Sequence, residues 1–382
     1  MVSSTLLVTN DFPPKVGGIQ SYLWELWQRL DPSSTAVLTA RSHRDFAAFD
    51  REQLARGLRI SRVRGRILFF PTPFALRRIR QACAETRPDL VLFDPVWPLG
   101  LLGPRIGVPY GVILHGAELA IPARIPLVRR GLASVLRGAA VVVSAGGYPA
   151  REAERLVGRA LANVVEVPPG IDGDRFERAD GPQRAATRRR LGLPEDALLV
   201  ASVSRLVPRK GMDVLIEAAR RLRPDHPDLV VAIAGDGRDG RRLDRLVMRT
   251  GAPVRLLGRV SEEDKSALLG VADVFVMACR NRWGGLEQEG FGIVFLEAAA
   301  AGLPQVAGES GGAAEAVLDQ QTGLVVARPD DPSEVAAALG RLLSDESLRR
   351  RMGSAARDRA LACFDYASLA PRLAEALAQV GG

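Results

Sequence analysis

The sequence has little cysteine and little histidine, and these shortages exclude several kinds of site. Its three cysteines lie far apart and show none of the spacings of zinc ligands, so we expect free thiols and no zinc or redox centre. The three histidines are equally scattered, and only His115 lies in a segment where chemistry is expected. The cysteines are Cys83, Cys279 and Cys363.

No apolar run has the roughly 18 residues that a membrane span requires. Even the apolar stretch of residues 90–114 is interrupted by Asp94, Arg105 and several prolines. The N-terminus has neither the basic start nor the small-residue cleavage site of a signal peptide. We therefore expect residues 6–9 to form the first β-strand of a cytoplasmic protein.

Positive charge is present in excess, but only in the first half of the chain. The net charge is +8, with 22 Lys and Arg against 13 Asp and Glu in residues 1–170, and 30 against 31 in residues 171–382. This asymmetry indicates an anionic partner for the first half, either nucleic acid or an acidic membrane surface. In the densest segment, residues 59–80, arginines flank aromatic residues, a composition suited to lipid headgroups. A strand and a helix with arginine-rich solvated faces would explain the segment equally well.

Short β-branched runs alternate with longer amphipathic stretches, which is typical of β-α-β units with a parallel sheet. The rhythm restarts after residues 168–182, which are rich in Pro, Gly and Asp. With 382 residues and 47% hydrophobic content, we expect an α/β protein of two doubly wound domains. The expected strands are 6–9, 90–93, 111–114, 140–144 and 164–167 in the first domain, and 198–202, 229–234, 254–257, 274–277, 304–307 and 323–326 in the second.

The end of the chain is expected to be helical. Residues 354–379 are rich in Ala, Leu and Arg, with a break at Phe364-Asp-Tyr366. We expect the last helix to cross back onto the first domain. That domain would then comprise residues 1–170 and about 366–382, and the second domain residues 171–365.

A glycine pair, Gly17 and Gly18, follows the first expected strand and precedes a helix. Glycines there let backbone amides approach a ligand closely at a helix N-terminus. The spacing Gly-x-Gly-x-x-Gly of dinucleotide-binding proteins is absent, which argues against a dehydrogenase. An ordinary strand-to-helix turn is the alternative explanation of the pair.

Two cations, Arg205 and Lys210, follow the strand that begins at Leu198, and Gly211 opens the next helix. In an open α/β sheet the ligand lies at the carboxyl ends of the strands. Two cations at this end could neutralise a leaving diphosphate. The alternative is an exposed basic loop, and of the three basic residues Arg209 is the one we expect to be merely solvated.

Two carboxylates are eight residues apart in the run Glu289–Glu297. Glu289 lies in a Gly-rich loop whose amides could face phosphate or sugar oxygens, and Glu297 lies about two turns into the following helix. Because its neighbours are apolar, Glu297 needs a hydrogen-bonding partner, and vicinal ribose hydroxyls would supply one. The alternative is a capping or surface carboxylate.

Two further features lie at expected strand ends. His115 directly follows the strand 111–114, where a histidine either contacts substrate or has a structural role. Gly311 and Gly312 precede a helix that starts near Ala313, and there the structural role is favoured.

These motifs resemble those of the retaining glycosyltransferases of the GT-B fold, which carry a Glu-x7-Glu motif, here Glu289 and Glu297. More narrowly, residues 8–14, 17–23, 204–211 and 290–302 are similar to the actinobacterial phosphatidylinositol mannosyltransferases. The resemblance implies two Rossmann-like domains facing across a cleft, the first binding the acceptor and the second the nucleotide-sugar donor.

The resemblance also implies roles for individual residues. Arg205 and Lys210 would hold the donor diphosphate, Glu297 the ribose, and Glu289 the transferred hexose, while His115 would approach the sugar near its reacting carbon. The other implied donor contacts are Gly18 near the diphosphate, Gly258, Arg259 and Val260 near the base, and Phe291, Gly292, Ile293 and Val294 around the hexose. Two departures are the sequence Gly-Ala-Glu-Leu-Ala after His115, where the mannosyltransferases tend to have a second histidine, and residues 124–137, which match poorly.

The implied reaction is transfer of mannose from GDP-mannose, with retention, to a phosphatidylinositol mannoside or related glycolipid. No cofactor or metal is expected, because the basic pair would neutralise the diphosphate. The expected location is cytoplasmic, peripheral on the inner face of the cell membrane, with no nucleic acid partner. The alternatives are a UDP- or ADP-hexose donor with a soluble glycan or small-molecule acceptor, and a non-enzymatic or nicotinamide-binding Rossmann protein.

Overall fold

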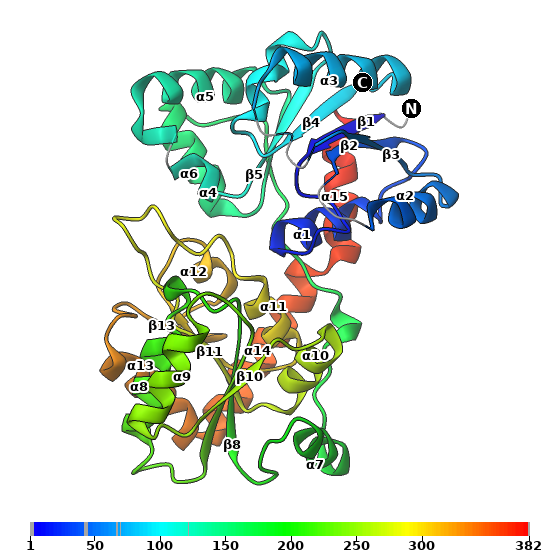
Figure 1. Ribbon diagram of the computed structural model, residues 1–382. Coiled ribbons are helices and arrows are strands. Elements are labelled where there is room, and N and C mark those ends of the chain that lie inside the picture. Colours follow the sequence, from blue (N-terminus) through cyan, green and yellow to red (C-terminus); the bar gives the residue numbers. More distant parts are fainter. Residues whose placement is uncertain (1–3, 42–44, 66–67, 69, 121, 381–382) are drawn as a thin grey trace. The chain divides into compact units, whose positions relative to one another are not determined.

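The computed structural model describes residues 4–380 apart from 42–44, 66–67, 69 and 121. The chain divides into two compact units (Figure 1). Unit 1 comprises Met1–Gly170 and Tyr366–Gly382, and unit 2 comprises Ile171–Asp365. Each unit contains one parallel sheet with its own helices, so the expected α/β class with two doubly wound domains is confirmed.

Unit 1 contains a seven-stranded sheet of order β3-β2-β1-β4-β5-β6-β7. Its strands are β1 (Thr5–Thr9), β2 (Thr35–Ala40), β3 (Arg59–Val63), β4 (Leu90–Asp94), β5 (Tyr110–Leu114), β6 (Val141–Ser144) and β7 (Val164–Glu166). Its helices are α1 (Gly18–Trp27), α2 (Phe46–Ala55), α3 (Pro73–Thr86), α4 (Ala117–Ala120), α5 (Pro126–Gly138), α6 (Gly147–Val157) and α15 (Tyr366–Ala378), with short 3-10 turns η1 (Leu99–Arg105) and η2 (Pro122–Arg124).

Unit 2 contains a six-stranded sheet of order β10-β9-β8-β11-β12-β13. Its strands are β8 (Leu198–Val203), β9 (Leu229–Ala234), β10 (Val254–Gly258), β11 (Val274–Met277), β12 (Gln305–Gly308) and β13 (Gly323–Val326). Its helices are α7 (Gly181–Arg190), α8 (Met212–Leu222), α9 (Gly240–Thr250), α10 (Glu262–Val271), α11 (Ile293–Ala300), α12 (Ala313–Ala316), α13 (Pro332–Ser344) and α14 (Glu346–Phe364), with 3-10 turns η3 (Gly173–Arg175) and η4 (Pro208–Lys210).

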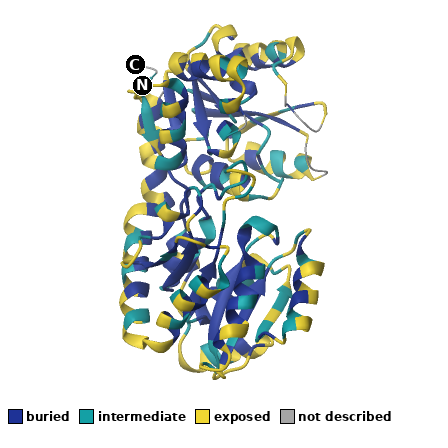
Figure 2. Cartoon of the chain, turned by 90° about the vertical axis from the view of Figure 1, so that its left-hand side faces the viewer, coloured by how far each residue is buried: buried dark blue, intermediate teal, exposed yellow. Residues whose placement is uncertain are grey.

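The central strands are apolar on both faces because helices cover both sides of each sheet. Along β1, Leu6 and Val8 belong to one buried cluster and Leu7 to another, so successive side chains face opposite sides of the sheet. Most strands in Figure 2 are accordingly dark blue, whereas the helices are banded with buried and exposed residues. The expected strand set omitted β2 and β3, which complete the outer part of the first sheet.

The C-terminal helix α15 belongs to unit 1. Tyr366, Leu369 and Leu373 share a buried cluster with Leu7 and residues of α1, and α15 lies beside α1 (Figure 1). The break predicted at residues 364–366 separates α14 from α15. Among the described residues, none of the helices has the length and apolar content that crossing a membrane would require.

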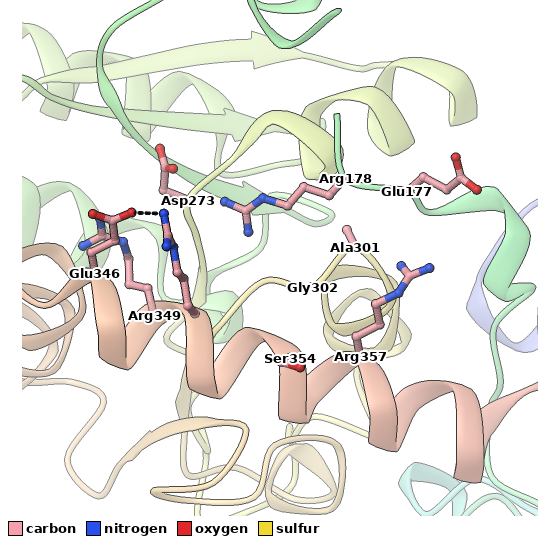
Figure 3. A pocket seen from close by; sticks show the side chains of 10 residues that line it. Glu177, Arg178, Asp273, Ala301, Gly302, Glu346, Arg349, Ser354 and Arg357 are labelled. Atoms are coloured by element: carbon pink, nitrogen blue, oxygen red, sulfur yellow. Dashed lines mark ion pairs between the residues drawn. The ribbon is translucent and has the colours of Figure 1, made fainter. Parts of the chain in front are cut away.

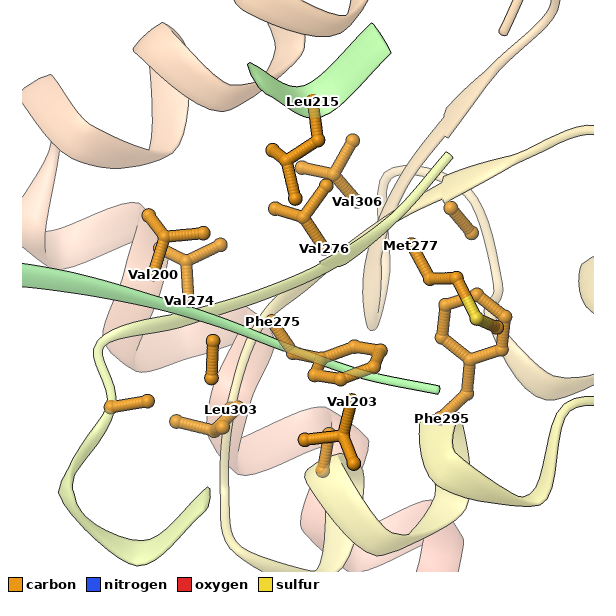
Figure 4. Close-up of a cluster of buried hydrophobic side chains, with 14 of the residues drawn as sticks. Val200, Val203, Leu215, Val274, Phe275, Val276, Met277, Phe295, Leu303 and Val306 are labelled. Atoms are coloured by element: carbon orange, nitrogen blue, oxygen red, sulfur yellow. The ribbon is translucent and has the colours of Figure 1, made fainter. Parts of the chain in front are cut away.

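In unit 2 the core fixes helix α11 against strand β11. The rings of Phe275 and Phe295 meet edge to face with centroids 5.6 Å apart, among valines of β8, β11 and β12 (Figure 4). Both rings are fully buried. Aromatic pairs of this geometry stabilise beyond the area they bury, so α11 starts from a fixed position at the carboxyl end of the sheet.

Candidate active site

Three loops of unit 2 meet around one buried carboxylate, that of Glu289. Lys210, at the end of η4 after β8, donates from Nζ to Glu289 Oε2 over 2.6 Å. Arg209 donates from Nη1 to the same oxygen over 2.9 Å. The amide of Glu289 donates to Ser310 Oγ, which follows β12, over 3.1 Å. The strand order reverses between β8 and β11, which is where open α/β sheets bind their ligands.

Glu289 is ionised in this setting. Burial alone would raise the pKa of its carboxyl group, but Lys210 and Arg209 outweigh burial and hold the pKa below its ordinary value. The prediction that Arg209 is merely solvated is therefore wrong. The one-turn helix η4 directs Arg209 and Lys210 to the same carboxylate, and both side chains are largely buried.

Glycines bring the backbone of these loops together. Gly211 has a φ of 69°, and a Cβ there would lie 2.0 Å from the carbonyl oxygen of Ala278. A Cβ on Gly311 would lie 2.1 Å from the carbonyl oxygen of Glu289, and one on Gly312 would lie 2.2 Å from that of Gly290. Gly311 and Gly312 thus have a structural role in seating the Glu289 loop, the role that the sequence favoured.

The two cations assigned to a diphosphate lie in different environments. Lys210 is buried and paired, whereas Arg205 is exposed and its guanidinium group has no hydrogen bond or ion pair with any described residue. Around Glu289, four cations face two carboxylates, because Arg282 and Arg238 lie 3.0 and 3.8 Å from Glu287. This end of the sheet has a net positive charge and a free guanidinium, which suits a diphosphate.

Glu297, on α11, has a protein partner that the sequence did not indicate. Lys265 of α10 donates to Glu297 Oε1 over 2.6 Å and also pairs with Glu262 at 2.7 Å. Burial nevertheless raises the pKa of Glu297, because Lys265 only partly offsets the loss of water. The second carboxylate oxygen has no partner among the described residues, so Glu297 retains acceptor capacity for a ligand.

The other predicted donor contacts lie along the same carboxyl edge. Gly292 caps α11 in a left-handed conformation with a φ of 84°, and no side chain caps that end. The amides of Ile293 and Val294 therefore lack helical acceptors. Phe291 is buried and packs against Phe364. Gly258 ends β10, Arg259 after it is exposed, and Val260 is half-buried.

Unit 1 has a comparable cluster around Asp94. His115 Nε2 lies 2.5 Å from Asp94 Oδ1, and Thr9 Oγ1 donates to Asp94 Oδ2 over 2.6 Å. The register of β1 and β4 places Thr9 beside Asp94. Burial would lower the pKa of His115, but Asp94 more than compensates, so the pKa is raised. His115 also donates its backbone amide to Glu118 over 2.7 Å.

The Gly17-Gly18 turn lies in the same unit, at the carboxyl end of β1. A Cβ on Gly18 would meet no heavy atom within 4 Å, so the space beside this first residue of α1 is open. In the preceding loop, Lys15 pairs with Asp11 at 2.6 Å, and Gln20 also donates to Asp11. No group of His, Cys, Asp and Glu among the described residues has a metal-binding arrangement.

Sequence reasoning missed Asp94 and Lys265, which hold two of the predicted site residues. Asp94 had a usable signal, because a carboxylate that ends an otherwise apolar strand lies at the ligand-binding edge of a parallel sheet. Lys265 lies 32 residues before Glu297, and no local pattern connects them.

Two doubly wound parallel sheets in one chain are the architecture of the GT-B fold. Comparison with known proteins identifies the family of this chain. Residues 183–359 match the family "Glycosyl transferases group 1". The chain is 38% identical, over 97% of both chains, to a GDP-mannose-dependent alpha-(1-6)-phosphatidylinositol monomannoside mannosyltransferase of Mycolicibacterium smegmatis. The chain therefore belongs to the group 1 glycosyltransferases.

A second relative and a solved structure extend this assignment. A GDP-mannose-dependent monoacylated alpha-(1-6)-phosphatidylinositol monomannoside mannosyltransferase of Corynebacterium glutamicum is 35% identical over 98% of this chain and 97% of its own. The crystal structure of Anabaena Alr3699/HepE in complex with UDP and glucose superposes with a TM-score of 0.80, covering 99% of this chain and 100% of that chain at 20% identity. That likeness supports the fold alone.

Proposed function

We propose that the chain transfers mannose from GDP-mannose to a phosphatidylinositol mannoside or a closely related glycolipid. The proposal rests on the similarity to the Mycolicibacterium smegmatis enzyme, which is named for this donor and acceptor and is 38% identical over 97% of both chains. A D-inositol 3-phosphate glycosyltransferase of Streptomyces avermitilis is 37% identical, but over only 59% of this chain and 49% of its own. The similarity to the glycolipid mannosyltransferase also covers unit 1. It favours a glycolipid acceptor, because unit 1 is the unit expected to bind the acceptor.

In this proposal unit 2 holds the donor. Arg205 and Lys210 bind the diphosphate, Glu297 accepts from the ribose, and Glu289 accepts from the hexose. The hydrogen bond between Lys210 and Glu289 supports these roles, because it holds the residue proposed to bind the diphosphate beside the residue proposed to bind the hexose. A lysine ammonium has three donors, so Lys210 can hold Glu289 and a phosphate oxygen together. The other proposed contacts are Gly258, Arg259 and Val260 for the base, and Phe291, Gly292, Ile293 and Val294 for the hexose.

For unit 1 we propose that His115 contacts the transferred sugar and that Gly18 allows the diphosphate to approach α1. The hydrogen bond to Asp94 orients the His115 ring and favours its protonated form. A cationic imidazole would stabilise negative charge that develops on the departing diphosphate. No metal or cofactor is part of the proposal, because cationic side chains supply the neutralising charge.

The donor is tested by thermal unfolding with GDP, UDP, ADP and NAD in turn. A ligand at about 100 times its dissociation constant stabilises by about 2.7 kcal/mol. We expect a rise in the unfolding temperature with GDP alone, followed by mannose transfer to a purified phosphatidylinositol monomannoside. A rise only with UDP or ADP would reject the donor and keep the family.

We further propose that residues 64–78 attach the chain to an anionic membrane on its cytoplasmic face. Phe70 and Phe74 are 66% and 57% exposed beside a cavity of about 350 Å³ that Arg64 also lines. Arg77 is exposed and has no partner among the described residues. Aromatic rings next to arginines suit the headgroup region. Arg66 and Phe69, in the same segment, lie outside the described residues.

Vesicle sedimentation tests this attachment. Arg77→Gln/Arg78→Gln should weaken binding to anionic vesicles by about 30-fold, at about 1 kcal/mol per arginine. Arg80 is left in place because it donates to the carbonyl oxygen of Arg105. The control is Arg51→Gln/Arg159→Gln, which removes the same charge from exposed positions of unit 1. Equal binding by both double variants would reject this membrane surface.

A further inference from the structure

Unit 2 contains a cavity of about 640 Å³ that the proposed reaction does not use (Figure 3). Asp273 directly precedes β11, and Ala301 and Gly302 precede β12, so the cavity lies at the amino ends of these strands. Glu289 and Lys210 lie at the opposite, carboxyl edge of the sheet. The cavity is therefore separate from the candidate active site. Its volume is in the range of small-molecule sites.

Four arginines line the cavity. Arg178 extends over it from the segment after η3, and Arg349 and Arg357 rise from α14 (Figure 3). Backbone carbonyls hold two of these side chains in place. Arg349 Nη1 donates to the carbonyl oxygens of residues 342 and 343, each over 2.7 Å, and Arg357 Nη1 donates to that of residue 176 over 3.0 Å. The remaining nitrogens of both guanidinium groups are left for a ligand.

Among the described residues, three of the four arginines, Arg178, Arg349 and Arg357, form no ion pair with a carboxylate of the cavity. Asp273 is already paired with Arg184 at 2.7 Å and with Arg188 at 3.1 Å. Glu346 pairs with Arg350, the fourth lining arginine. Arg178 has no hydrogen bond or ion pair with any described residue, and its guanidinium group extends toward Asp273, whereas Glu177 points away from it (Figure 3).

The crowding of like charge is reflected in Arg178. Burial first, and then the nearby Arg184, Arg349 and Arg350, lower the pKa of its guanidinium group, and Asp273 only partly offsets them. An arginine surrounded by other arginines gains most from an anion that several of them share. Planar guanidinium forks pair with phosphate oxygens through two parallel hydrogen bonds.

We propose that this cavity binds a small anion with two or more phosphate charges, as a second ligand site of the enzyme. Arg178 and Arg350 close over the anion, and Arg349 and Arg357 hold it from the α14 side. The same chemistry is offered by a soluble phosphorylated metabolite and by a phosphorylated lipid headgroup. The site does not depend on the identity of the sugar donor.

Calorimetric titration with inorganic pyrophosphate at low ionic strength tests the site. Saturating GDP is present so that the candidate donor site is occupied. The test variant is Arg178→Gln/Arg350→Gln, because neither side chain holds a backbone carbonyl. The control, Arg249→Gln/Arg351→Gln, removes the same charge from exposed positions of unit 2 outside the cavity. A parallel sedimentation assay uses vesicles that contain phosphatidylinositol 4-phosphate.

Wild type and control should bind pyrophosphate, and the test variant should bind about 100-fold more weakly, at about tenfold for each arginine lost. If only vesicle binding is lost in the test variant, the site is confirmed and its ligand is the lipid phosphate. Absence of binding by the wild type in both assays, or equal binding by both double variants, would reject the site. If GDP does not bind, the proposed donor is rejected. The comparison of pyrophosphate binding by the two double variants still tests the second site, because both variants have an unchanged donor site.

Discussion

The two units build the same three-part arrangement from different side chains. In each, an acidic residue at or after the end of the fourth strand of the order 3-2-1-4-5-6 takes partners from the ends of the first and fifth strands. In unit 1 the Asp94 carboxylate is held by Thr9 and His115, whereas in unit 2 Lys210 holds the Glu289 carboxylate and Ser310 accepts from the Glu289 backbone amide. The switch point of a doubly wound sheet thus gathers three strand ends around one acid, whatever partners the sequence supplies.

The two clusters differ in the type of basic side chain that pairs with the acid, and therefore in how its charge depends on pH. Glu289 is held by a lysine and an arginine, the two side-chain types whose ordinary pKa values lie far above neutral pH. Asp94 is held by the imidazole of His115, whose pKa burial would lower but Asp94 raises above its ordinary value, and histidine is the side chain whose ordinary pKa lies nearest to physiological pH. The cluster in unit 2 is therefore a fixed electrostatic site, whereas the cluster in unit 1 changes with pH.

The largest expected effect comes from removing the fixed charge. Lys210→Ala should lower mannose transfer by about 100- to 1,000-fold, the effect of losing one group that stabilises developing charge. Arg209 still neutralises Glu289, so the variant should fold, as circular dichroism would show. Arg249→Ala, at an exposed position of the same unit outside the candidate site, is the control and should transfer at a near-normal rate. Transfer by Lys210→Ala at the wild-type rate would reject the fixed site.

Glu297→Gln sharpens the comparison by testing the other acid of unit 2. GDP should bind about tenfold more weakly, since a hydrogen bond to a charged group contributes about 1.5–3 kcal/mol. The raised pKa of Glu297 means that the wild type loses stability as pH rises from 4.5 through the pKa in the folded state. The glutamine variant should lack this loss in unfolding experiments between pH 4 and 7. Unchanged GDP affinity would contradict the ribose role.

His115→Gln tests the pH-sensitive cluster of unit 1. Because the pKa of His115 is raised, its contribution to stability is complete below about pH 6.5 and disappears as pH rises through the pKa in the folded state. The wild-type unfolding temperature should fall relative to the variant over that range, by about 2–4 °C for each 1 kcal/mol in a unit of this size. His226→Gln, in unit 2, should keep the wild-type slope. If the unfolding temperatures of wild type and His115→Gln change with pH in parallel, the cluster around Asp94 is not pH-sensitive.

Gly18→Ala should have the smallest effect. The added methyl group meets no protein atom within 4 Å, and alanine should stabilise the start of α1 by up to about 1 kcal/mol. If the diphosphate approaches this turn, transfer should nevertheless fall several-fold through a higher KM for GDP-mannose. A stabilised variant with unchanged KM would leave α1 a purely structural element.

The sequence predicted the fold well because its signal is local. Runs such as Leu90–Phe93 are short, apolar and β-branched, and their alternation with helices requires a parallel sheet. The Glu-x7-Glu run likewise placed Glu289 and Glu297 on one loop and helix. Partners could not be predicted in this way. Lys265 reaches Glu297 from another helix, and Asp94 meets His115 only through the register of neighbouring strands.

The prediction that Arg209 is merely solvated was wrong for the same reason, because its partners lie far away in the sequence. Between Pro208 and Gly211 a sequence gives no means to decide which of two adjacent basic side chains turns inward. In the structure both turn inward, because Gln288 and Glu289 present a carbonyl and a carboxylate to the same turn. Charge pairing between distant loops is a property of the folded sheet edge rather than of either loop.

Lysine is rare in this chain, and its placement has a practical consequence. Of the 52 basic residues only three are lysine, and each pairs with an acid at a strand-end loop or on α11, Lys15 with Asp11, Lys210 with Glu289 and Lys265 with Glu297. Reductive methylation with carbon-13 formaldehyde would therefore label three side chains and the α-amino group. The resulting NMR spectrum would contain one lysine probe in unit 1 and two in unit 2, so that each ligand could be followed in the intact enzyme by the lysine amino group that its binding disturbs.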